Sequence, residues 1–189
     1  MSDLLLLLGG AALVNNFVLV QLLGLCPFMG TSNRIETALP MGIATVFVIT
    51  VSTLISNLLN RYVLDPWDLK YLQIIVFIVV IASVVQLTER YIRFASPLLH
   101  QLLGLYLPLI TSNCAVLAIA LTVADLGLAE ALAVGVGAGL GFSLVLVLFA
   151  GLRLRIDQNS TPKSFRGAPI ALVTVGIIAL AFVGFRGML

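Results

Sequence analysis

Six long stretches of the chain carry no charged residue and consist mainly of apolar side chains, and short polar segments separate them. The stretches are Leu4–Asn33, Thr37–Asn60, Tyr71–Thr88, Phe94–Ala124, Ala131–Leu152 and Gly167–Phe185. A helix needs about 20 apolar residues to cross the hydrocarbon core of a bilayer. The pattern therefore predicts an all-α integral membrane protein with six transmembrane helices, folded as a single transmembrane domain over residues 1–189.

The first and fourth stretches, with 30 and 31 residues, are too long for one straight helix, and each contains helix-breaking residues. The first contains Gly24–Gly30, with Pro27 at its centre, and the fourth contains Pro108 followed by Thr111–Cys114. Proline removes a backbone donor, and glycine weakens a helix. We therefore expect both spans to be broken into half-helices, with Pro27 and Asn113 near the starts of the second halves. Such breaks survive in a membrane only where protein buries them or where they line a cavity.

The two interrupted spans hold the same place in each half of a three-plus-three arrangement. Paired interruptions of this kind indicate an inverted repeat with a site near the membrane midplane. We expect the halves to cover about residues 1–95 and 96–189, with opposite topology.

Two registers relate the halves. In one, Gln21–Leu25 recurs as Gln101–Leu105, and a Thr-Ser-Asn tripeptide recurs at the same offset. In the other, Asn16–Leu19 matches the segment Asn113–Leu117. The sequence leaves both registers open.

Charge is sparse: 10% of the residues are charged, against about 25% in a soluble domain, so lipid is the expected main solvent. The net charge of +2, without a basic run, excludes a nucleic-acid partner. The loops after the first, third and fifth stretches hold seven of the ten Lys and Arg residues. Positive residues accumulate on the cytoplasmic side. We therefore expect a multi-pass protein of the bacterial inner membrane with both termini in the periplasm.

The only two cysteines, Cys26 and Cys114, lie one in each break. They could pack as small apolar residues, or form a disulfide, although an oxidising compartment does not reach the membrane interior. They could also bind a soft metal or an iron–sulfur cluster as thiolates, helped by the positive ends of half-helices. Two thiolates are half of a usual ligand set, and no cluster of His, Asp or Glu completes it. The lone histidine, His100, is expected at the membrane interface and not as a ligand. A partner must therefore supply the remaining ligands of a metal site.

For other polar and small residues at membrane depth, the sequence indicates several roles and does not single one out. Polar groups near the breaks can join helices, line an ion path or donate to metal-bound sulfurs; they are Asn15, Asn16, Thr111, Ser112 and Asn113. Alternating glycines in the fifth stretch favour close helix packing, within the chain or against a partner; they are Gly135, Gly137, Gly139 and Gly141. Glu89, with Arg90 and Arg93, is expected to form a solvated cytoplasmic cap.

Four segments together resemble the A-type branch of the Rnf family of membrane subunits: Asn15–Val20, Gly24–Gly30, Val84–Glu89 and Leu107–Leu117. The resemblance covers essentially the whole chain. The homologous E-type component of the sodium-pumping NADH:quinone reductase has similar motifs, but Cys-Pro-Phe-Met-Gly is more similar to the Rnf branch.

The resemblance implies a membrane subunit of an ion-translocating ferredoxin:NAD oxidoreductase, which is not catalytic alone. It implies that Cys26 and Cys114 hold a [2Fe–2S] cluster shared with a homologous E-type subunit of inverted topology. Electrons would cross the membrane through that cluster, between partner subunits of the B, C, D and G types, coupled to Na⁺ or H⁺ movement. The alternatives are the equivalent subunit of the sodium-pumping reductase, a secondary transporter with inert cysteines, and a purely structural subunit.

Overall fold

The computed structural model describes residues 7–14, 16–32, 35–67, 69–95, 104, 107–156 and 162–184, and within these ranges every regular element is a helix. The elements are η1 (Gly10–Val14), α2 (Phe17–Gln21), α3 (Leu25–Thr31), α4 (Ile35–Leu59), η2 (Asn60–Leu64), α5 (Asp65–Trp67), η3 (Lys70–Leu72), α6 (Gln73–Ala95), α8 (Leu107–Thr111), α9 (Cys114–Thr122), α10 (Leu128–Arg155), η4 (Lys163–Phe165) and α11 (Ala168–Val183).

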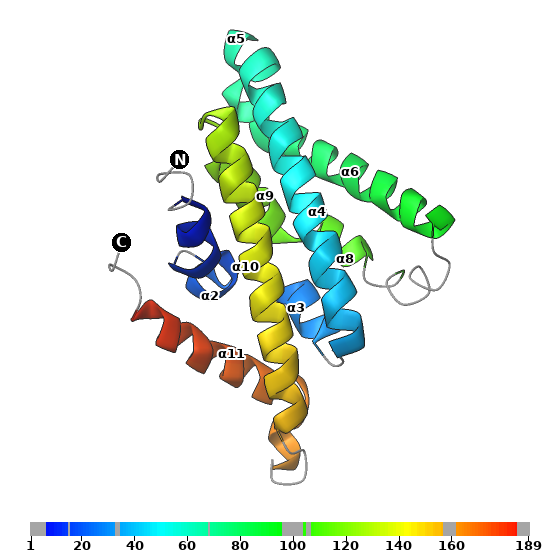
Figure 1. The fold of residues 1–189 in the computed structure, drawn as a ribbon, viewed down its shortest axis with the longest axis vertical. Helices are drawn as coiled ribbons and strands as arrows, with labels where there is room; N and C mark the ends of the chain where they lie inside the picture. Colours follow the sequence, from blue (N-terminus) through cyan, green and yellow to red (C-terminus); the bar gives the residue numbers. More distant parts are fainter. Residues whose placement is uncertain are drawn as a thin grey trace.

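Two long helices, α4 and α10, form the centre of the molecule and run antiparallel side by side (Figure 1). Glycines of α10 allow this contact. A Cβ built on Gly135 would lie 2.5 Å from Thr53 Oγ1, and one built on Gly139 would lie 3.0 Å from Val46 Cα. Small residues let helix backbones approach closely, and the van der Waals packing that results is one of the forces that associate helices in lipid.

The other two glycines of this run, Gly137 and Gly141, face the N-terminal segment of the chain. A Cβ on Gly137 would lie 2.6 Å from the Leu8 carbonyl oxygen, and one on Gly141 would lie 2.5 Å from that of Ala12. All four glycines are buried. The sequence left open whether these glycines pack within the chain or against a partner, and the structure places all four against other parts of this chain.

Helices α6 and α11 lie at the periphery, on opposite sides of the central pair (Figure 1). Their outer faces are apolar and uncovered by the described chain: Ile75 and Val79 of α6 are 61% and 59% exposed, and Leu180 of α11 is 75% exposed. Apolar faces of this extent require lipid or a further protein chain. The sequence-based prediction of an all-α membrane protein is confirmed at this level.

Three of the six predicted spans are helices long and apolar enough to cross a bilayer, namely Ile35–Leu64, Lys70–Phe94 and Leu128–Arg155. The sixth predicted span appears as α11, with 16 residues. The first and fourth are interrupted, as predicted. The first interruption lies at Leu22–Gly24, just before α3, so Pro27 is the third residue of a helix and not its start. A second interruption, at Asn16, was not foreseen.

Candidate functional site

The two interrupted segments meet at their breaks. The Gly24 N–H donates a hydrogen bond to Cys114 Sγ over 3.0 Å, although the two residues are 90 positions apart in sequence. Cys114 is the first residue of α9, and Gly24 directly precedes α3, in which Cys26 is the second residue. Both cysteines therefore occupy the first turn of a short helix, where backbone N–H groups and the positive end of the helix dipole lie.

The first break depends on two residues with left-handed backbone conformation. Leu22 has φ +54° and closes α2 through a hydrogen bond from its N–H to the Phe17 carbonyl oxygen. Gly24 has φ +78°, a conformation that glycine adopts without steric cost. A Cβ on Gly24 would lie 2.9 Å from Asn113 Oδ1 and 3.0 Å from Phe142 Cε2. Gly24 is thus required both by its dihedral angle and by the closeness of the second break.

Asn113 forms the second break as an N-cap. Its side-chain Oδ1 accepts from the Ala115 N–H at 3.1 Å, with φ −72° and ψ 108°. Asn16 caps α2 in the same way: Oδ1 accepts from the Val18 N–H at 3.0 Å, with φ −64° and ψ 113°. The two asparagines therefore cap α2 and α9 with the same geometry. This geometry confirms that Asn113 starts a half-helix.

The Asn113 amide has one group without a partner in the described part of the chain. Asn113 is 2% exposed, and its Nδ2 is buried without any hydrogen-bond acceptor among the described residues. An unsatisfied buried donor costs about 1–3 kcal/mol. A donor of this kind, one residue before Cys114, is suited to an acceptor outside the described residues.

The remaining predicted polar residues have ordinary structural contacts or lie beyond the described ranges. The Asn16 Nδ2 donates to the Ala12 carbonyl oxygen at 3.1 Å. Ser112 is exposed, and its Oγ donates weakly to the Pro108 carbonyl oxygen at 3.4 Å. Thr111, half-buried, is the last residue of α8. Asn15 and His100 lie outside the described residues.

Both cysteine thiols are free and exposed. Among the described residues, no three His, Cys, Asp or Glu side chains are grouped as a metal site would require. The described residues therefore offer two exposed soft ligands, which are half of a four-ligand site.

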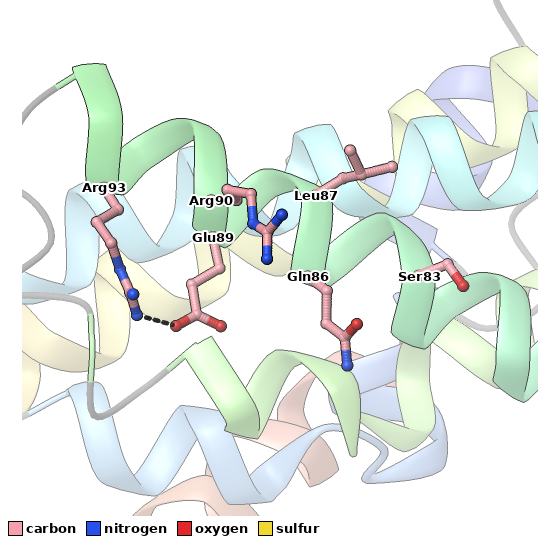
Figure 2. A pocket seen from close by; sticks show the side chains of 6 residues that line it. All are labelled: Ser83, Gln86, Leu87, Glu89, Arg90 and Arg93. Atoms are coloured by element: carbon pink, nitrogen blue, oxygen red, sulfur yellow. Dashed lines mark hydrogen bonds and ion pairs between the residues drawn. The ribbon is translucent and has the colours of Figure 1, made fainter.

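A separate hollow of about 550 Å³ lies along the last turns of α6, lined by Ser83, Gln86, Leu87, Glu89, Arg90 and Arg93 (Figure 2). Arg93 and Glu89 form an ion pair of 3.3 Å, with side chains 65% and 32% exposed. Exposed pairs of this kind contribute little to stability. Their exposure agrees with the predicted solvated cap.

Comparison with known proteins gives consistent results along the whole chain. The family model described as "Rnf-Nqr subunit, membrane protein" matches residues 4–189. A protein of Azotobacter vinelandii, named as the A component of an ion-translocating oxidoreductase complex, is 57% identical, covering 100% of this chain and 99% of the relative. Proteins of the same name from Pseudomonas aeruginosa and Actinobacillus pleuropneumoniae are 56% and 54% identical, each covering 100% of this chain and 98% of the relative.

Proposed function

Because the chain belongs to the Rnf-Nqr family of membrane subunits, we propose that it carries electrons across the membrane within a redox-driven ion translocase. Its relatives are the A components of ion-translocating oxidoreductase complexes, and by this relationship the chain is an Rnf-type membrane subunit. In the proposal, Cys26 and Cys114 supply two of the four thiolates of a [2Fe–2S] cluster. A homologous E-type subunit supplies the other two.

One observation carries the proposal: two exposed thiols stand at helix N-termini whose breaks touch through the 3.0 Å contact between Gly24 N and Cys114 Sγ. Iron–sulfur clusters are held by cysteine thiolates and tuned by hydrogen bonds to the sulfurs. The Gly24 N–H and the Asn113 Nδ2, which has no acceptor among the described residues, are donors next to Cys114. The residues present therefore fit half of such a site.

The bound cluster would supply one-electron transfer, and the residues of this chain would hold it and set its surroundings. Cys26 and Cys114 would bind iron, while the first turns of α3 and α9 stabilise negative charge on the sulfurs. Phe142, which is 2% exposed and lies beside the Gly24 break, would exclude water from the protein side. The exposed side of the thiols is left for the partner subunit.

The arrangement of helices supports an inverted repeat. The order of two short helices, one long helix and one peripheral helix occurs twice, as α2–α3–α4–α6 and α8–α9–α10–α11. Equivalent contacts cross between the halves: α2 touches α11 and α9, while α8 touches α6 and α3. Helices α4 and α10 run in opposite directions (Figure 1), as two repeats of opposite topology would require. With an inverted partner, such a protein would place a shared cluster near the midplane.

Ion coupling would use neutral groups or a different component of the complex. The buried polar residues of the described helices are all uncharged, and include Thr45, Ser52, Ser56 and Asn57 of α4. The proposal places the chain in the bacterial inner membrane with both termini periplasmic. Subunits of the B, C, D and G types would complete the complex and pass electrons to and from the cluster, coupled to Na⁺ or H⁺ movement.

The test is electron paramagnetic resonance of the purified, chemically reduced complex, repeated with Cys26→Ser and with Cys114→Ser. Each variant should lose the signal of one [2Fe–2S] cluster and two iron atoms per complex, because a two-iron cluster needs four ligands. Ser83→Ala, a small change at an exposed α6 residue, is the control. Retention of every iron–sulfur signal in both cysteine variants would refute the proposal. Uptake of a solute by this chain alone in liposomes would instead favour a secondary transporter.

A further inference from the structure

The short helix that carries Cys26 is held at its far end by a cation from another helix. Arg153, in the last turn of α10, donates from Nη1 to the Met29 carbonyl oxygen at 3.0 Å and to Ser32 Oγ at 2.8 Å. Met29 lies in the last turn of α3, and Ser32 is its C-cap. The last carbonyl groups of a helix lack partners within the helix, and a cation there also complements the helix dipole.

A second contact fixes α3 along its length. The rings of Phe28 and Phe149 are stacked, with centroids 4.6 Å apart. Phe149 lies one turn before Arg153 on α10, so both contacts come from one face of that helix. A helix of seven residues is too short to be stable by itself. Its C-terminal end is therefore attached to α10 by one apolar and one polar contact, and Arg153 supplies the polar one.

The helix that carries Cys114 is held at the corresponding end by neutral groups. The Asn57 Nδ2 donates to the carbonyl oxygens of Val123 and Leu126, at 2.8 and 3.0 Å, just beyond the end of α9. The Asn60 Nδ2 donates to the Ala124 carbonyl oxygen at 3.1 Å. Each cysteine thus begins a short helix whose other end is bound by the long helix of a repeat. Of these two attachments, the one on α3 carries a charge.

We propose that Arg153 is a positioning residue for Cys26. This inference rests on the proposed cluster function. Seven residues of helix span about 10 Å, so a shift at the C-terminal end of α3 moves Cys26 at the other end. The guanidinium fixes the distance between the two thiols, and its charge favours the more negative, reduced state of a cluster held there.

The test compares Arg153→Gln, Arg153→Lys and Arg155→Gln in the purified complex. Arg155→Gln is the matched control, since it removes the same charge from an exposed side chain two residues away on the same helix. Arg153→Gln should change the shape of the paramagnetic signal and lower the midpoint potential of the cluster. It should also speed the loss of iron to a chelator roughly tenfold, because charge-assisted hydrogen bonds are lost. Arg153→Lys should retain the potential but not the full resistance to the chelator.

A second readout needs no cluster. In a Cys114→Ser background, alkylation of Cys26 by a maleimide in native membranes should be several-fold faster with Arg153→Gln than with Arg155→Gln. If Arg153→Gln prevents assembly, Ser32→Ala removes one of the two bonds and should give smaller shifts in the same direction. Unchanged alkylation, signal and potential in both variants would overturn the positioning role. If no iron–sulfur signal of the unmodified complex depends on Cys26 or Cys114, the cluster itself is refuted. The two failures are therefore distinguishable.

Discussion

The sulfur of Cys114 lies 3.0 Å from the backbone nitrogen of Gly24. This contact joins the starts of α9 and α3, two short helices from opposite halves of the chain. It also aims a backbone donor at a sulfur that is otherwise exposed. The break in each helix is thus what makes backbone donors available at the thiols, because uninterrupted helices would use those N–H groups internally.

Replacement of Gly24 by alanine should damage the site. The left-handed backbone at φ +78° costs a residue with a Cβ about 1–2 kcal/mol, and the new methyl group would lie 2.9 Å from Asn113 Oδ1. Gly24→Ala is expected to reduce the amount of assembled complex and its iron content. Gly176→Ala, with no neighbour within 4 Å of the added Cβ, is the control and should leave both unchanged. Equal iron content in the two variants would contradict the account of Gly24.

The Asn113 side chain should matter through both its cap and its free donor. Asn113→Ala removes an N-cap worth about 1 kcal/mol together with the buried Nδ2, whereas Asn113→Asp keeps a capping oxygen and replaces the donor with a carboxyl oxygen, which adds an ionisable group. Both variants should lower the midpoint potential of the cluster, because a donor near the sulfurs is lost. Asn16→Ala, which removes the equivalent cap of α2, should lower thermal stability alone. A redox titration in which Asn113→Asp matches the unmodified complex would exclude the donor role.

The glycines of α10 should differ in their tolerance of a methyl group. Gly139→Ala places a Cβ 3.0 Å from Val46 Cα, and overpacking of this kind costs about 1–3 kcal/mol. Gly151→Ala, in the same helix, meets nothing within 4 Å and should raise stability by up to about 1 kcal/mol through helix propensity. Thermal unfolding of the purified complex should show opposite shifts of the midpoint. Shifts of the same sign would mean that α4 and α10 are not packed as described.

Asn57 should anchor the end of α9. Asn57→Ala removes one donor from each of the carbonyl oxygens of Val123 and Leu126, although the Val123 oxygen still accepts from the Leu126 N–H. Each lost hydrogen bond is expected to cost about 0.5–1.5 kcal/mol. Faster backbone hydrogen exchange is expected over α9 and the following turn, with little change in α3. If the hydrogen-exchange rates of α9 are the same in the variant and in the unmodified complex, Asn57 does not anchor this helix.

The sequence predicted the membrane class, both interrupted spans and the cysteines at the breaks, because charge-free length, proline and an N-capping asparagine have local physical meaning. It did not reveal the break at Asn16, since that residue lies in an apolar run without glycine or proline beside it. Leu22 adopts a left-handed conformation that leucine rarely takes, so its identity gave no signal.

Long-range partners were also beyond sequence reasoning. Arg153 counted only as a loop charge, and Asn57 and Asn60 as part of an apolar span. Their roles depend on the ends of α3 and α9 meeting α10 and α4, which no local pattern encodes. The alternating glycines predicted close packing, but only the fold assigns Gly139 to α4 and Gly141 to the N-terminal segment.

In the proposed function, this chain holds half of a ligand set that a second protein completes. The most direct measurement removes iron from the purified complex with a chelator, oxidises it mildly and separates the subunits without reductant. Cys26 or Cys114 should then form a disulfide with a cysteine of the partner subunit, giving a covalent heterodimer that the Cys26→Ser, Cys114→Ser double variant lacks. A chain that remains monomeric, or that links only its own two cysteines, would contradict a shared site.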